Sequence, residues 1–317
     1  MSVLVYAETE GGKLKKVAFE VASYGKAVAD QMGTEVIAVT FNAADADALG
    51  NYGVSKVMNI AVDGSFDAKI YASGIEQAVN EAAAKVVVVS SSADSRYLTP
   101  LLAVVLEAGY ATNVVTAPSN LAPFTVKRTA FTNKAFTQTE ISSEVKIIGV
   151  SNNAFGLVEN ATACTVEDFA PSLAASTITV ESVDKATDKV TIADAEVVVS
   201  GGRGLKGPEN WHLIEDLADT LGAATACSKP VSDMGWRPHS EHVGQTGKPV
   251  ASNLYIAIGV SGAIQHLAGI NSSKVKVVIN NDPEAPFFKA ADYGIVGDAF
   301  EVVPQLIEKL KAFKAQA

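Results

Sequence analysis

The sequence contains little cysteine. Cys164 and Cys227 are the only two among 317 residues, and they are far apart in the chain. A disulfide scaffold needs several cysteines, and a thiolate metal site needs closely spaced ones, as in CxxC, so both are excluded. The two thiols are expected to be reduced and intracellular.

Long apolar runs are also missing. The longest such stretch, 254–270, is interrupted by Ser261, Gln265, His266 and glycines. A membrane-spanning helix needs about 20 predominantly apolar residues, so no membrane insertion is expected. The first residues form a strand-like apolar run with neither a basic leader nor an Arg-rich presequence, which indicates no export or organelle import. A soluble, cytoplasmic protein of bacterial type is therefore expected.

Positive charge is in short supply. Lysine and arginine number 25 against 35 aspartates and glutamates, which gives a net charge of −10. Such a surface would repel a phosphate backbone, so nucleic acid is not an expected ligand. Hydrophobic residues are plentiful, at 48% of the chain, and this is enough to bury two ordinary cores. Two domains are expected.

The first 116 residues alternate short apolar runs with alanine-rich helical stretches. This alternation predicts parallel βαβ units. The apolar runs are rich in Val and Ile and lack polar alternation, as is typical of strands that helices cover on both faces. The predicted strands are 3–7, 36–40, 57–60 and 86–90, and the predicted helices lie near 16–32, 67–84 and 95–109.

Between about 121 and 180 the chain becomes rich in Thr, Ser and Val. This composition favours strands of antiparallel type that complete or flank the first sheet. A short polar stretch, 184–189, then precedes a new α/β series that begins at 197, so a boundary is placed near 186. The prediction is an α/β protein of two domains: 1–186 with a mixed sheet, and 187–317 with a doubly wound parallel sheet. The predicted antiparallel segments are 126–131, 135–141, 145–150 and 178–181.

In the second domain, five apolar runs are each followed at once by a turn of Gly, Ser or Asx residues. Ligands of open parallel sheets bind outside the carboxyl ends of the strands, so these turns should converge on one crevice. The predicted strands are 195–200, 223–226, 254–260, 275–279 and 293–296, and the turns are 201–204, 227–230, 261–263, 280–282 and 297–298.

Two of these turns are predicted to open helices, 205–221 and 263–268. The free N–H groups and positive dipole ends of such helices suit a pyrophosphate. Arg203 adds a fork of donors that matches phosphate oxygens. Tight turns and a surface charge are the alternative for each feature alone, but the five turns together favour a binding site for a dinucleotide.

A nicotinamide-dinucleotide fingerprint is one alternative for this site. Residues 202–207 fit GxGxxG after a strand. The next strand, however, ends in 226–229 with no carboxylate for a ribose hydroxyl. This weakens the prediction of NAD binding.

Two other motif matches fail. Residues 259–263 nearly fit a hydrolase nucleophile elbow, but only His266, one turn further on, could follow as the triad histidine. The Gly-Lys pair 247–248 resembles the end of a phosphate-binding P-loop, but His242 and Pro249 occupy positions where the motif needs Gly and Ser or Thr. Neither a serine hydrolase nor a P-loop is predicted.

The histidines divide into two groups. His239 and His242 have ligand-like spacing, but a loop rich in Pro and Gly is more often solvated than metallated, so no metal is expected. His266 lies in the first turns of the helix after Ser261 and can project toward a ligand at that helix end. The alternative for His266 is a hydrogen-bonded core histidine.

Five segments together resemble the signature of the electron transfer flavoprotein alpha subunit. They are 200–206, 243–248, 254–269, 279–280 and 292–298, and the resemblance covers 200–304 with little interruption. The N-terminal domain is compatible with the first domain of that family, although its match is looser.

The resemblance implies a subunit that binds FAD and forms a heterodimer with a beta subunit, which the N-terminal domain contacts. It implies electron uptake from flavoprotein dehydrogenases, such as the acyl-CoA dehydrogenases of fatty acid β-oxidation, and delivery to a quinone reductase or another acceptor. Such a protein is a redox carrier rather than an enzyme. The FAD domain of the family is mobile, which makes 184–189 a candidate hinge. The remaining alternatives are a regulatory protein that binds an adenine nucleotide and an NAD-linked oxidoreductase.

The resemblance also assigns roles. Thr246 would approach flavin N5, His266 the C2 carbonyl, and Asn280 with Asp298 the ADP half. Lys229 stands where the family usually has Arg, which keeps the charge but loses planar stacking. A cation or donor near N1 and C2 raises the reduction potential, and His266 and Lys229 are the candidates. The predicted FAD contacts are Arg203, Ser228, Lys229, Val243, Gly244, Gln245, Thr246, Ser261, Gly262, Ala263, Ile264, Gln265, His266, Asn280, Asp298 and Ala299.

Overall fold

A computed structural model describes residues 2–131, 133–183, 191–192 and 195–315. The chain folds as two compact units, one of residues 1–130 with 136–184 and one of 131–135 with 185–317. The boundary predicted near 186 and the candidate hinge 184–189 lie outside the described residues. No helix in the described part of the chain is long and apolar enough to cross a membrane.

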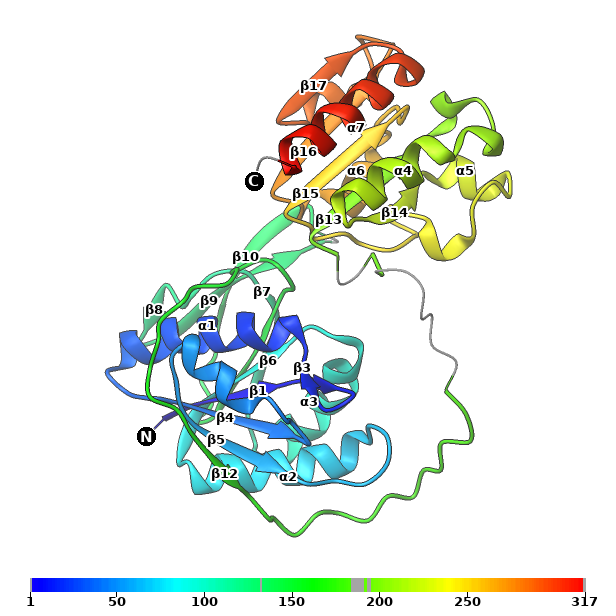
Figure 1. Cartoon of the computed structure of the whole chain (residues 1–317). Coiled ribbons are helices and arrows are strands. Elements are labelled where there is room, and N and C mark those ends of the chain that lie inside the picture. Colours follow the sequence, from blue (N-terminus) through cyan, green and yellow to red (C-terminus); the bar gives the residue numbers. More distant parts are fainter. Residues whose placement is uncertain (1, 132, 184–190, 193–194, 316–317) are drawn as a thin grey trace. The chain divides into compact units, whose positions relative to one another are not determined.

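The first unit is built on a ten-stranded mixed sheet (Figure 1). Its parallel strands lie in the order β12-β5-β4-β1-β6-β11-β7, and β9 pairs antiparallel with β7. The strand order reverses between β1 and β6, and β11 is inserted between β6 and β7. The strands are β1 (Ser2–Ala7), β4 (Val36–Phe41), β5 (Val54–Ile60), β6 (Ala84–Ser90), β7 (Gly109–Val114), β8 (Asn120–Leu121), β9 (Phe124–Ala130), β10 (Ala135–Glu140), β11 (Lys146–Val150) and β12 (Thr165–Asp168), with β2 (Thr9–Glu10) and β3 (Lys13–Leu14) as a separate pair.

Helices cover both faces of this sheet. On one face α1 (Lys16–Met32) packs against side chains such as Val3 and Val5, and on the other α2 (Ala68–Glu81) and α3 (Ala93–Val105) pack against Leu4 and Val87. Alternate residues of one strand therefore enter two different cores. This explains why the strands read as continuous apolar runs, and it confirms the predicted α/β class.

Two predictions for 145–181 are wrong. The segment 145–150 forms β11, which is parallel to both β6 and β7 rather than antiparallel. Its apolar residues are buried as in a central strand, and burial does not specify strand direction. No strand forms at 178–181, where Ile178 is 69% and Val180 is 48% exposed. A β-favouring composition without a buried face does not suffice for a strand.

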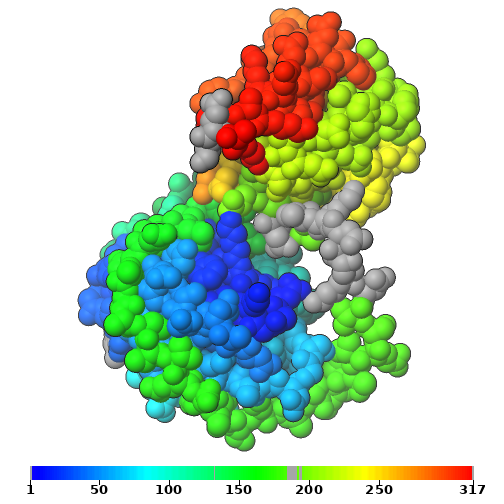
Figure 2. All heavy atoms as spheres, in the orientation of Figure 1, coloured from blue at the N-terminus to red at the C-terminus, as the bar shows by residue number. Residues whose placement is uncertain are grey.

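The helix predicted near 95–109 ends early, and the last predicted residue already belongs to a strand that was not predicted. Helix α3 stops at Val105, and β7 begins at Gly109. The sequence prediction also lacked β12, which pairs with β5 at the edge of the sheet. Around β12, residues 155–176 follow the outside of the first unit (green in Figures 1 and 2) and are held there by bonds such as Ser172 N–H to Gln77 Oε1 at 3.0 Å.

The second unit contains a parallel sheet in the order β14-β13-β15-β16-β17. In chain order this is 2-1-3-4-5, a doubly wound arrangement that reverses between β13 and β15. All five predicted strands form: β13 (Val197–Gly201), β14 (Ala224–Cys227), β15 (Leu254–Ile258), β16 (Val275–Asn280) and β17 (Tyr293–Val296).

Helices also cover both faces of the inner strands of this second sheet, while β17 at its edge is exposed. Helices α4 (His212–Leu221) and α7 (Ala299–Lys314) share one core with Val199 and Ile258, while α6 (Ile264–Ile270) belongs to the core on the other face. The outer side of α7 faces solvent (red in Figure 2). The prediction of a doubly wound sheet is confirmed.

The helix predicted at 205–221 begins seven residues late, at His212. After β13 the chain forms a 3₁₀ turn at Arg203–Leu205, and Lys206 takes a left-handed conformation with φ 67°. Pro208 follows, and a proline disfavours helical geometry in the residue before it. The positive end of α4 therefore does not lie at the glycine turn, and the expected helix-dipole contribution from 205–221 is absent.

Candidate functional site

The turns after β13 and β15 meet at the point where the strand order reverses. The Gly202 N–H donates to the Ile258 carbonyl at 2.9 Å, and the Gly204 N–H donates to the Gly259 carbonyl at 3.1 Å. A Cβ atom on Gly202 would lie only 2.1 Å from the Gly259 oxygen. Glycine is needed at 202 because two backbones touch, and the contact places both turns at one edge of a cavity.

This cavity has a volume of about 400 Å³, within the range typical of small-molecule sites, roughly 300–1,000 Å³. It lies at the carboxyl ends of β13, β14, β15 and β16. Four of the five predicted turns contribute to it, and the turn after β17 does not. The lining residues are Arg203, Gly204, Ser228, Lys229, Pro230, His242, Val243, Gly244, Gln245, Thr246, Gly259, Val260, Ser261, Ala263, Gln265, His266, Asn280, Asp282 and Ala285.

Twelve of the sixteen predicted contact residues line this cavity, and four do not. Asp298 instead caps α7, with Oδ1 accepting the Phe300 N–H at 2.9 Å, and its Oδ2 lies 3.8 Å from Lys206 Nζ. Gly262 packs against Phe287, so it is not open to the cavity. Contact of any of the sixteen with FAD stays a prediction. The four residues outside the lining are Gly262, Ile264, Asp298 and Ala299.

The sequence prediction missed seven lining residues. Gly204 and Gly259 lie inside the segments that carried the resemblance, so their neighbours could have suggested them. His242 immediately precedes the predicted turn at 243 but was expected to be solvated. Val260 lies in such a segment too, and Pro230 and Asp282 belong to predicted turns. Ala285 could be found only from the fold, because its exposure to the cavity depends on how distant turns meet. The missed residues are Gly204, Pro230, His242, Gly259, Val260, Asp282 and Ala285.

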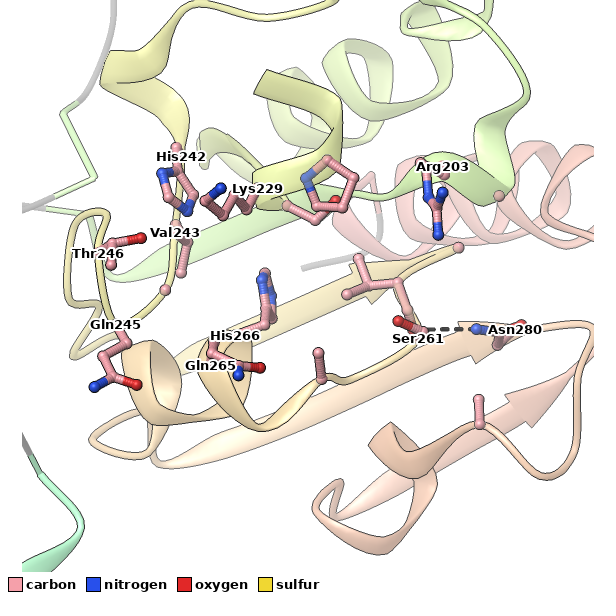
Figure 3. Close-up of a pocket in the computed structure, with 18 of the residues that line it drawn as sticks. Arg203, Lys229, His242, Val243, Gln245, Thr246, Ser261, Gln265, His266 and Asn280 are labelled. Atoms are coloured by element: carbon pink, nitrogen blue, oxygen red, sulfur yellow. Dashed lines mark hydrogen bonds between the residues drawn. The ribbon is translucent and has the colours of Figure 1, made fainter. Parts of the chain in front are cut away.

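One end of the cavity is formed by Arg203, Ser261 and Asn280 (Figure 3). Asn280 Nδ2 donates to the Val260 carbonyl at 3.1 Å, and its Oδ1 accepts the Asp282 N–H at 3.0 Å. These bonds tie together the turns after β15 and β16. The Arg203 guanidinium can bind oxyanions through two parallel bonds, so this end suits a phosphate group.

The other end contains Lys229, His242 and Thr246, and His266 points toward it from α6 (Figure 3). Lys229 is exposed, and its Nζ lies 3.0 Å from Asp233 Oδ2. Thr246 belongs to the turn 243–246, whose Gln245 N–H donates to the Gln265 carbonyl at 2.7 Å. This end thus combines a hydroxyl, a cation and two imidazoles.

His266 is buried and neutral. It is 6% exposed, and Nε2 lies 2.9 Å from the Tyr255 hydroxyl oxygen, while Nδ1 has no hydrogen-bond partner. Burial lowers the pKa of His266 to about 4; His242 adds to the effect, and the Val243 backbone opposes it. Burial also keeps the pKa of Tyr255 above its usual value, so that hydroxyl retains its proton. His266 at neutral pH can therefore serve as a hydrogen-bonding group but not as a cation.

His242 corrects the expectation of a solvated two-histidine loop. It is 1% exposed, and its Nδ1 has no hydrogen-bond partner, whereas His239 remains exposed. Burial lowers the pKa of His242, and the neighbouring His239 lowers it further. Among the described residues, no three His, Cys, Asp or Glu side chains gather closely enough to hold a metal ion.

Comparisons with known proteins agree with this geometry. Residues 3–187 match the electron transfer flavoprotein domain, and residues 191–271 match the electron transfer flavoprotein FAD-binding domain. An electron transfer flavoprotein subunit alpha from Syntrophomonas wolfei is 36% identical over 321 residues, which covers 97% of this chain and 98% of the relative. Its counterpart from Bacillus subtilis is 35% identical over 98% of this chain and 97% of the relative.

A mitochondrial alpha subunit from Arabidopsis thaliana is 55% identical over 124 residues, which covers 39% of this chain and 34% of the relative. The resemblance inferred from the five sequence segments is confirmed, and neither alternative function gains support. The chain belongs to the family of electron transfer flavoprotein alpha subunits, and its second unit carries the FAD-binding domain of that family.

Proposed function

We propose that this chain is an electron carrier that holds FAD in the cavity of its second unit. It accepts electrons from flavoprotein dehydrogenases, acyl-CoA dehydrogenases among them, and passes them to a quinone reductase or another acceptor. The observation that carries this proposal is a cavity at the strand-order reversal with two chemically different ends.

The residues present fit FAD. The end with Arg203 and the crossed glycine turns offers a guanidinium and close backbone approach, which suit a pyrophosphate. The end with Thr246 and His266 offers hydrogen-bonding groups in a partly dry setting, which suit the edge of a flavin. When bound, FAD supplies the redox chemistry. The chain binds it, orients it and sets the polarity around its ring.

The carrier role also fits what the lining contains. Asp282 is the one carboxylate among the described lining residues, and it is exposed. Both imidazoles are buried, with a pKa below the ordinary value. No hydrogen bond among the described residues joins a lining hydroxyl to either imidazole, so the cavity holds no ready pair of nucleophile and base for a substrate of its own. We therefore assign this chain electron transfer and no separate catalytic turnover.

The partner in this proposal is an electron transfer flavoprotein beta subunit, which the first unit contacts in a heterodimer in the cytoplasm. Support comes from the relatives, which are named as alpha subunits. The family match over 3–187 supports a role for the first unit in that assembly.

The test is to purify the chain with its beta subunit and measure the flavin absorption band and the nucleotides released on denaturation. Arg203→Ala should weaken FAD retention about tenfold or more, because it removes a charge-assisted contact to phosphate. Lys206→Ala is the matched control. That cation lies on the same turn but outside the lining, over the Phe300 ring at 4.8 Å. A folded, colourless complex that takes up no added FAD would refute the proposal, and release of NAD would favour the oxidoreductase alternative.

A further inference from the structure

His242 lines the cavity directly before the predicted contact Val243, but it is not itself among the predicted contacts. It follows the 3₁₀ turn His239–Glu241, and its backbone is pinned on both sides. The Val243 N–H donates to the Cys227 carbonyl at 3.0 Å, and the Lys248 N–H donates to the His242 carbonyl at 2.8 Å. The ring is thereby fixed at the cavity wall instead of turning into solvent.

The ring has unused hydrogen-bonding capacity. His242 makes no side-chain hydrogen bond with the described residues, and its Nδ1 is buried without a partner. Its Nε2 lies beside Gly244, so close that a Cβ at that position would be 3.4 Å away. The buried Nδ1 loses its solvation without compensation. The ring as a whole lines the cavity, so a ligand there would bond to it through an atom that the cavity exposes.

His266 forms the facing part of the same end, from α6. Its Nε2 is engaged by Tyr255, whereas the His242 ring has no such partner. The charged and titratable groups that face His242 are Lys229 and Asp233 from α5 (Lys229–Asp233), His239 from the preceding 3₁₀ turn, and His266. Asp233 favours a charged His242 imidazole, whereas His239 and Lys229 disfavour it.

We propose that His242 is a second cofactor-facing imidazole and that it takes up a proton from solvent when negative charge builds up in the cavity on reduction. This inference rests on the proposed function. The electrons come from a reduced flavoprotein dehydrogenase. The proton bonds to a ring nitrogen of His242, so the side-chain charge goes from zero to plus one, and no bond between heavy atoms forms or breaks.

The charge state of the cavity decides the sign of this coupling. Without a ligand, burial and the neighbouring His239 lower the pKa of His242, so the ring is neutral at pH 7. Added negative charge nearby raises the pKa of an imidazole. Proton uptake then accompanies reduction at any pH between the two pKa values, and in this window the reduction potential falls more steeply as pH rises.

The direct test uses the FAD-loaded complex and histidine NMR. The chain has only four histidines, so the His242 ring resonance can be assigned by substituting each in turn. Titration of the oxidised and the dithionite-reduced complex should show the His242 midpoint higher in the reduced form by about one pH unit or more. The exposed His239 should shift by no more than a few tenths of a unit. This measurement needs no activity assay.

The second test measures the reduction potential against pH for the wild type, His242→Gln and His239→Gln. Glutamine keeps a hydrogen-bonding amide but cannot titrate. His242→Gln should lose the steeper segment of the curve, and His239→Gln should retain it. If His242→Gln does not fold, the NMR titration of the wild type decides alone.

The outcomes separate the two proposals. A complex that binds FAD but shows equal His242 midpoints in both redox states overturns this inference and leaves the electron carrier intact. Curves of reduction potential against pH that coincide for the wild type and His242→Gln would also overturn this inference and leave the electron carrier intact. A complex that binds no FAD overturns both.

Discussion

The two units have the same kind of strand-order reversal but different chemistry at it. The reversal lies between β1 and β6 in the first unit and between β13 and β15 in the second. Carboxyl ends of parallel strands at such a point form a crevice that ligands can occupy. In the second unit, glycine turns border an open cavity there. In the first, a buried carboxylate occupies the equivalent position.

That carboxylate belongs to Glu8, which directly follows β1 and is 2% exposed. Its Oε1 accepts hydrogen bonds from the hydroxyls of Ser90, Ser92 at 2.8 Å and Ser95 at 2.9 Å. Its Oε2 lies 3.6 Å from Lys15 Nζ. Ser92 is also the N-cap of α3, so the chain supplies its own anion at the start of this helix.

The comparison shows that topology creates the crevice and the residues after the strands decide its use. Glu8 places negative charge where an external phosphate would have to bind, and it uses up the hydroxyl donors. The second unit has the cation Arg203 and small residues in this place. The negative charge of Glu8 thus keeps anions out of the first reversal, whereas the positive charge of Arg203 attracts them to the second.

The largest expected effect comes from closing the second reversal. Gly202→Val should destabilise the second unit by roughly 3–5 kcal/mol and abolish FAD binding, because the new side chain must displace the Gly259 backbone. The control is Gly222→Ala, where φ is +67° but no atom lies within 4 Å of an added Cβ, at an expected cost of about 1 kcal/mol. Urea unfolding and FAD titration measure both. A well-folded Gly202→Val variant with normal FAD affinity would contradict the close backbone contact between Gly202 and Gly259.

The next largest effect is expected from removing the buried carboxylate at the first reversal. Glu8→Ala should destabilise the first unit by roughly 2–4 kcal/mol, because three serine hydroxyls and Lys15 lose a buried partner. Glu81→Ala, at an exposed helix end, should change the stability by less than about 0.5 kcal/mol. The FAD affinity of the second unit should be unchanged in both variants. An equal, small effect of the two substitutions on denaturant midpoints would show that Glu8 is not a structural anion.

A smaller effect concerns pH and the second unit. The pKa of His266 is about 4 in the folded chain, below its ordinary value. As pH falls from about 6.5 to 5, the unfolded chain binds a proton that the folded chain does not, so the stability should fall by roughly 1.5 kcal/mol. The loss continues toward pH 4 and then levels off. His266→Gln should lack this component, which the difference between the two stability profiles measures for the ligand-free chain. Parallel profiles would mean that His266 titrates normally.

Much of this architecture could be predicted from the sequence. The central strands β13 and β15 are continuous apolar runs because both their faces are buried, whereas β17 at the edge is exposed. Each strand of this sheet is followed by a turn of small or polar residues, so the strand ends and the crevice could be located. The direction of β11 could not be predicted, because the apolar residues of Lys146–Val150 indicate that the strand is buried but not how its neighbours run. The early end of α3 at Val105 is a boundary within a run of good helix formers.

The site was predictable where it is local in sequence. Most residues of two short segments, 243–246 and 261–266, line the cavity. Each segment lies in a turn or directly after a strand. The burial of His242 was not predictable, because its position depends on backbone bonds to Cys227 and Lys248 rather than on its own loop. The position of Asp298 outside the lining likewise depends on its capping of α7.

The smallest expected effect tests why Glu8 should contribute more to stability than Asp233, a carboxylate near the second reversal. We attribute the difference to the burial of Glu8 and not to the presence of a carboxylate. Asp233 pairs with Lys229 at 3.0 Å, but both side chains are more than half exposed. Exposed pairs four residues apart contribute about 0.3–0.5 kcal/mol, so Asp233→Asn should barely move the unfolding midpoint. The same substitution frees Lys229 at the cavity and removes a negative charge near His242, so the pKa of that ring should fall slightly. A loss of stability as large as that of Glu8→Ala would show that charge pairing matters equally at both reversals, and the contrast drawn from burial would then be wrong.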